Sequence, residues 1–187
     1  LPIWQYWQAT GNAGFMSIFG AELLFEIARF WASIAHFNAK RDRYEIHGVM
    51  GPDEYHEEDP NNEGEVGLRN NAYTNVMVAW SMDAALKALD SLLPYRRDEL
   101  RETLDLTDEE VSIWADMSRK LFVPFHDDGI ISQFEGYEKL KEFDWEGYRK
   151  KYGNIARLDR ILEAEGDSPN RYKLSKQADV LMLFYLF

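Results

Sequence analysis

The sequence contains no cysteine among its 187 residues, and it has few basic residues relative to acidic ones. The absence of cysteine excludes a disulfide framework, a thiolate metal site and a cysteine nucleophile. The chain carries 21 Lys and Arg against 33 Asp and Glu, which gives a formal net charge of −12. This charge argues against nucleic acid or an anionic membrane surface as the main partner.

The two ends of the chain lack the features of ordinary domain ends. The sequence finishes with apolar residues throughout 180–187, a run far shorter than the roughly 20 residues that span a bilayer. It opens without the basic, apolar and small-residue succession of a secretory signal, which favours a cytoplasmic protein. We expect the last run to be a core helix cut before its stop signal, so that the chain is a fragment of a larger protein. A hydrophobic tail docked on its own core is the alternative.

What the sequence does contain is helical periodicity in a chain that is 45% hydrophobic. Apolar residues recur every three to four positions, and a capping box at Thr107 and Glu110 marks one helix start. Predicted helices cover 13–37, 73–93, 107–121, 144–151, 154–165 and 171–187. The aromatic stripes of the first two, for example Phe15, Phe30 and Trp80, are interpreted as core.

Signals for β-strands are sparse. Only 43–47 and 129–134 have the composition of short strands, and no repeat of 20–50 residues is evident. The predicted class is therefore all-α, with long loops and at most short strands. Helices joined alternately by short turns and long loops indicate a helical toroid or bundle rather than an α/β fold.

Candidate chemistry lies in the long loop between His47 and Asn75, where several carboxylates are crowded together. Loops of this length in compact domains are usually functional or disordered. Crowding and burial raise carboxyl pKa values, and a carboxylic acid that stays protonated near neutral pH can act as a general acid. The spacing does not identify which carboxylate that is, and a solvated acidic loop is the simpler alternative.

The same loop lacks the ligand patterns of common metal sites. The stretch 59–64 resembles the first half of an EF-hand calcium loop, but its twelfth position is Asn70 rather than glutamate. His47 and His56 lack the helical spacing of a zinc site, and no HExxH motif is present. The sequence therefore predicts no metal site.

Four ordered motifs resemble those of glycoside hydrolase family 65, which includes the maltose, trehalose and kojibiose phosphorylases. The first is Gly-Pro-Asp-Glu-Tyr-His-Glu at 51–57, followed by Asn-Asn-Ala-Tyr-Thr-Asn at 70–75. Two further pieces are Asp-Gly-Ile-Ile-Ser-Gln-Phe-Glu-Gly-Tyr at 128–137 and Lys-Gln-Ala-Asp at 176–179, and the helical stretch 22–33 also agrees. Residues 58–69 resemble an insertion relative to the family, which puts the acceptor preference in doubt.

The resemblance implies a fold and a set of site residues. It implies that residues 1–187 form part of an (α/α)6 barrel, the catalytic domain of a longer chain. Glu54 would be the general acid, while Lys176 and Gln177 would hydrogen-bond the hydroxyls of the glucosyl ring. Asp53, Tyr55 and His56 would support the site and the bound substrate. Gln133 and Glu135 could face the pocket or only cap a turn.

The implied reaction is phosphorolysis of an α-linked glucose disaccharide with inversion, which gives β-glucose 1-phosphate and a second sugar. Phosphate is itself anionic, so a phosphorylase needs no general base, whereas an inverting hydrolase does. The partners are a disaccharide and phosphate, with no cofactor, and a homodimer of the full-length protein is possible. A family hydrolase, or a non-catalytic helical module that binds sugar or protein, is the alternative. Members of the family have an upstream Trp-Asp segment that helps to hold the sugar and a downstream segment that binds phosphate. Neither segment is in this sequence, so we expect the 187 residues alone to be inactive.

Overall fold

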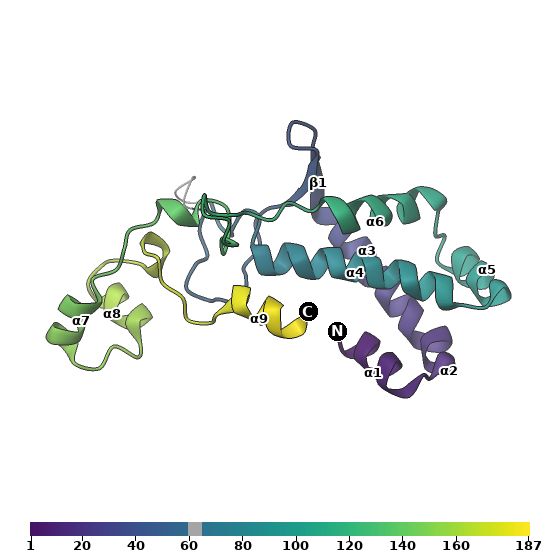
Figure 1. Ribbon diagram of the computed structural model, residues 1–187, viewed down its shortest axis with the longest axis horizontal. Helices are drawn as coiled ribbons and strands as arrows, with labels where there is room; N and C mark the ends of the chain where they lie inside the picture. Colours follow the sequence, from purple (N-terminus) through teal and green to yellow (C-terminus); the bar gives the residue numbers. More distant parts are fainter. Residues whose placement is uncertain (60–64) are drawn as a thin grey trace. The chain divides into compact units, whose positions relative to one another are not determined.

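A computed structural model describes residues 1–59 and 65–187 of the chain (Figure 1). Over these residues the structure is mainly helical, with one two-stranded sheet. The predicted all-α class with at most short strands is therefore confirmed. The chain divides into two compact units, formed by residues 1–45 with 76–122 and by residues 46–75 with 123–187.

The first unit holds most of the long helices. Its elements are α1 (Pro2–Thr10), α2 (Ala13–Phe15), a π-helical turn (Met16–Gly20), α3 (Ala21–Ile34), β1 (Ala35–Asn38), β2 (Arg43–Ile46), α4 (Ala72–Ser91), α5 (Pro94–Thr103) and α6 (Asp108–Lys120). The boundary between the units falls inside two of these elements, because the last residue of β2 and the first turn of α4 belong to the second unit. The predicted strand 43–47 is confirmed, because β2 pairs with β1. The predicted helix 13–37 ends at Ile34 instead, since the backbone of Ala35–Asn38 is used in that pairing.

The predicted capping box is present at the start of α6. The Thr107 side chain accepts a hydrogen bond from the Glu110 backbone, and the Glu110 side chain accepts one from the Thr107 backbone. Glu110 also accepts a 2.8 Å hydrogen bond from Nε of Arg29 on α3, and Phe25 of α3 packs near Trp114 of α6. The same glutamate therefore caps α6 and joins it to α3.

The apolar stripe predicted to be the core face of α3 is on its exposed side. Its exposed members are Ile18 and Phe19 of the π-helical turn and Leu23, Ile27, Phe30 and Ile34 of α3, whereas Leu24, Phe25 and Ala28 of α3 are buried. The helix has two apolar faces, and periodicity alone does not decide which one is covered. The prediction of the core face was wrong for this reason.

The second unit contains shorter elements and much irregular chain. Its helices are α7 (Trp145–Tyr152), α8 (Leu158–Ala164) and α9 (Asp179–Leu186), with 3-10 turns at Tyr137–Lys139 and Pro169–Arg171. Two apolar clusters support them. One contains Phe143, Leu158, Leu162 and Leu174, and the other contains Leu68, Phe134 and Leu140. Glu165, just after α8, accepts hydrogen bonds from Tyr148 and Tyr152 of α7, so these two helices lie side by side (Figure 1).

Three predicted elements of this unit differ from the structure. Residues 129–134 form no strand. A turn joins His126 to Ile130, and beyond it the pairing is limited to one antiparallel bridge between Phe125 and Ile131. The helix predicted from Asn154 starts at Leu158. The last helix starts at Asp179 rather than at residue 171, because the backbone N–H groups of Lys176 and Gln177 donate to the Asp53 side chain instead of to a helical carbonyl. None of the helices in the described ranges combines the length and hydrophobicity that a membrane crossing requires.

The long loop between His47 and Asn75 folds back on itself at Gly48 and Gly67. Val49 and Leu68 exchange backbone hydrogen bonds, and Gly67 donates a 2.6 Å hydrogen bond to the Glu57 carbonyl. Gly67 has a φ of 87°, and a Cβ there would lie 2.4 Å from the backbone of Gly48. Only glycine satisfies both the positive φ and this close approach.

We expect Gly67→Ala to lower the free energy of unfolding by about 3 kcal/mol, because the variant adds a backbone collision to the strain of a positive φ. Gly129→Ala is the matched control, since its φ is 83° and nothing lies within 4 Å of an added Cβ. It should cost only about 1 kcal/mol. Urea unfolding of the two variants measures the difference, and equal losses would contradict the role given to the Gly48 contact.

Candidate active site

The loop that carries the Gly-Pro-Asp-Glu-Tyr-His-Glu motif is partly buried. Asp53 and His56 are each 1% exposed, whereas Glu54 and Glu57 are exposed. A solvated acidic loop would leave all of these side chains in water. The structure instead fixes two polar residues of the motif in the interior and leaves the glutamate between them accessible.

The Asp53 carboxylate is the centre of this arrangement. One oxygen accepts backbone hydrogen bonds from Lys176 at 2.8 Å and Gln177 at 3.3 Å. The other lies 2.6 Å from Nε2 of Gln133 and 3.4 Å from Nδ1 of His56. Burial opposes ionisation of Asp53, but the hydrogen bonds from these four residues outweigh it and lower its pKa below the ordinary value.

Glu54 and the Lys-Gln pair are brought together by this contact. Nζ of Lys176 donates to the Glu54 carboxylate, and the Glu54 backbone N–H donates to Oε1 of Gln177 at 3.4 Å. The hydrogen bond from Lys176 to Glu54 raises the pKa of that lysine. The three residues that the motifs single out as acid and sugar ligands are thus neighbours, although more than 120 positions separate Glu54 from the pair.

His56 and Tyr55 have supporting positions. Nδ1 of His56 faces Asp53, and its Nε2 lies 2.9 Å from the carbonyl oxygen of Tyr172. Both ring nitrogens face oxygen acceptors, so His56 ties the loop to the chain that precedes Lys176. Tyr55 packs against the cluster around Phe143, and burial raises the pKa of its hydroxyl.

Asn70 and Asn71 of the second motif are fully buried. Asn70 has a φ of 51°, and its side chain accepts hydrogen bonds from the Ile46 backbone and from Asn75. It also donates to Glu135 at 2.7 Å. The sequence left open whether Glu135 and Gln133 face the pocket. In the structure Gln133 faces Asp53, and Glu135 bonds Asn70.

Sequence reasoning missed Asp179 as a member of the site. It is 2% exposed at the first turn of α9, and Asn71 lies 3.4 Å from its carboxyl group. Burial, reinforced by the charge of Asp53, raises the pKa of Asp179. Its place as the last residue of the Lys-Gln-Ala-Asp motif was the signal that could have identified it.

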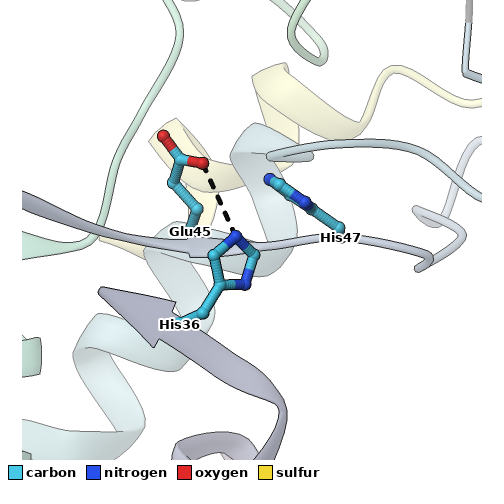
Figure 2. Close-up of side chains that lie close together, drawn as sticks. All are labelled: His36, Glu45 and His47. Carbon is cyan, nitrogen blue, oxygen red and sulfur yellow. Dashed lines mark ion pairs between the residues drawn. The ribbon is translucent and has the colours of Figure 1, made fainter. Parts of the chain in front are cut away.

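Two features bear on metal binding. Asp59, the first residue of the calcium-like stretch, pairs with Nε of Arg69 at 2.5 Å, and the other residues of that stretch, 60–64, lie outside the described residues, as does much of the suggested insertion 58–69. In the first unit, His36 on β1 lies 3.6 Å from Glu45 on β2 (Figure 2). Glu45 also accepts hydrogen bonds from Asn38 and Arg41. Because Arg41 already neutralises this carboxylate, we assign the pair to the stability of the hairpin.

Comparisons with known proteins identify the family of this chain. Residues 1–187 match the sequence profile of the glycosyl hydrolase family 65 central catalytic domain. An uncharacterized glycosyl hydrolase of Mycobacterium tuberculosis is 57% identical over 98% of the chain, which corresponds to 14% of that relative. The trehalose 6-phosphate phosphorylase of Lactococcus lactis and the kojibiose phosphorylase of Halothermothrix orenii are each 37% identical over 98% of the chain and 22% of their own length.

A solved structure of a candidate kojibiose phosphorylase from the human microbiome has the same fold. It superposes with a TM-score of 0.76 at 24% identity, over 98% of this chain and 24% of that chain. The chain therefore spans roughly a seventh to a quarter of the proteins that it matches.

Because Asp53 is ionised in the folded protein, the free energy of unfolding should depend on pH in a specific way. Because its pKa is lowered on folding, Asp53 stabilises the protein above its unfolded pKa of about 4, and this contribution is lost as the pH falls through the folded pKa. We expect Asp53→Asn to cost about 2–4 kcal/mol at pH 7 and progressively less below pH 4. Urea unfolding from pH 7 to pH 3 measures this, with the exposed Asp127→Asn as control. A constant difference across that range would contradict the assignment.

Proposed function

Because this chain belongs to glycosyl hydrolase family 65, we propose that it supplies the general acid and part of the sugar site of an inverting glycoside phosphorylase. The observation that carries this proposal is the contact of Glu54 with Lys176 and Gln177 across the buried Asp53 carboxylate. A proton donor and two polyol ligands then meet at one place, as cleavage of a glycosidic bond requires.

In the proposed reaction Glu54 gives its proton to the glycosidic oxygen while a phosphate oxygen attacks the anomeric carbon from the opposite face. The bond from carbon to the leaving oxygen breaks, and the bond from carbon to phosphate forms with inversion. The hydroxyl proton of the phosphate leaves the product ester to solvent, and Glu54 regains a proton from solvent, which restores the acid. One carboxyl group is enough, because the anionic nucleophile needs no base.

Lys176 has two uses in this scheme. In the structure its ammonium group is paired with Glu54. When a glucosyl ring is bound, its hydroxyl oxygens accept hydrogen bonds from the ammonium group of Lys176 instead. This exchange frees the Glu54 carboxyl group to act on the glycosidic oxygen. Gln177 holds the backbone of Glu54 through its carbonyl oxygen, so its amide N–H groups remain for the sugar.

The proposed substrates are an α-linked glucose disaccharide and inorganic phosphate, with no further cofactor. The relatives named as phosphorylases of kojibiose and of trehalose 6-phosphate support this class. A relative named only as a glycosyl hydrolase favours hydrolysis as the second candidate, in which water replaces phosphate. A homodimer and a cytoplasmic location of the full-length protein stay predictions.

The test is Glu54→Gln in the intact protein, which keeps the shape of the side chain but removes its proton. We expect phosphate-dependent turnover of kojibiose, maltose, trehalose or trehalose 6-phosphate to fall about 10²- to 10⁴-fold. Product analysis should show β-glucose 1-phosphate. Glu57→Gln, an exposed glutamate in the same loop, is the matched control and should retain the full rate.

Two results would change the proposal. An unaffected rate in Glu54→Gln would overturn the assignment of the general acid. Release of free glucose at the same rate with and without phosphate would replace phosphorolysis by hydrolysis, because a phosphorylase requires its second substrate for turnover.

A further inference from the structure

Gln133 occupies an interior position at which three sequence segments of the site meet. Its side chain is 7% exposed, and Nε2 donates a 2.6 Å hydrogen bond to Asp53. The Gln133 side chain also favours ionisation of the Asp179 carboxyl group at the first turn of α9. One glutamine thus links the loop that carries Glu54 to the first turn of α9.

The backbone of Gln133 makes a third connection. Its carbonyl oxygen accepts a 2.9 Å hydrogen bond from the backbone of Ala72 and a 3.3 Å hydrogen bond from Nδ2 of Asn71. The start of α4 is thereby attached to the same residue. Gln133 therefore contacts the acid loop, the Asn-Asn motif and the Lys-Gln-Ala-Asp motif.

The chemistry of an amide suits this position. Asp53 and Asp179 are both buried carboxyl groups, and the charge of Asp53 makes ionisation of Asp179 less favourable. An uncharged side chain with two N–H donors can serve both of them without adding charge. A glutamate of the same size would bring a third carboxyl group between two others, and an apolar residue would leave buried oxygens without a donor.

We propose that Gln133 is a positioning residue that aligns the general acid Glu54 with the sugar ligands Lys176 and Gln177. It acts through Asp53. Gln133 fixes one oxygen of that carboxylate, and the other oxygen then accepts the backbone N–H groups of Lys176 and Gln177. Since Asp53 directly precedes Glu54, its orientation sets the course of the chain that carries the acid. This inference rests on the proposed function.

The test compares two substrates of the intact protein that differ in their need for an acid. The second sugar of a disaccharide would leave as an alkoxide unless Glu54 protonates the glycosidic oxygen, whereas α-glucosyl fluoride releases fluoride without an acid. We expect Gln133→Met to lower kcat for phosphorolysis of the disaccharide about 10- to 100-fold, since small misplacements of a catalytic group cost this much. Turnover of α-glucosyl fluoride should fall much less. Gln8→Met, an exposed glutamine of α1, is the matched control.

A merely structural role gives a different result. Loss of folded protein would lower both rates in the same proportion, and that outcome, or a wild-type rate on both substrates, would overturn the inference. Should Gln133→Met not fold, Gln133→Asn keeps the donors on a side chain one methylene shorter, and the same selective loss is expected.

Glu54→Gln in the same assay separates the two proposals. If it keeps full disaccharide turnover, the proposed function fails. If it loses turnover while Gln133→Met does not, only the positioning role fails.

Discussion

The buried carboxylate of Asp53 is the interaction on which the second unit depends. It lies beside Glu54 in sequence, and it accepts the backbone N–H groups of Lys176 and Gln177, which therefore do not begin a helix. A buried carboxylate is costly unless donors compensate for the lost water. Gln133 and His56 complete that compensation. One charge thus determines where α9 starts and which residues meet at the site.

The sequence predicted those parts of the fold that depend on neighbouring residues. The capping box at Thr107 and the strand that ends at Ile46 are local signals, and both are present. The π-helical turn, the short helix α5 with its polar composition, and the start of α9 were not predicted. Each depends on partners distant in sequence or on a pattern without apolar periodicity. The core face of α3 was misassigned because the helix is apolar on two sides.

The candidate site shows the same division. The motifs identified Glu54, Lys176 and Gln177, but no spacing indicated that the two segments touch. Asp179 was overlooked, and the orientation of Gln133 was left open, because a buried amide between two carboxyl groups has no sequence signature. Hydrogen-bond partners more than 60 positions apart become visible only once the chain is folded.

Asp53 and Glu54 are adjacent carboxyl groups in opposite environments, because the first is buried among hydrogen-bond donors and the second is accessible to solvent and to Lys176. The Asp53 side chain is 1% exposed and has donors from four residues, so its charge is locked into the structure. The Glu54 side chain is 58% exposed, and its carboxylate pairs with Lys176, which is itself partly exposed. In the proposed function a sugar hydroxyl replaces the Glu54 carboxylate as the hydrogen-bond partner of Lys176. Under the proposed function, the buried carboxyl group holds the loop in place and the accessible one acts on the substrate. This division of roles follows from which of the two residues the fold buries.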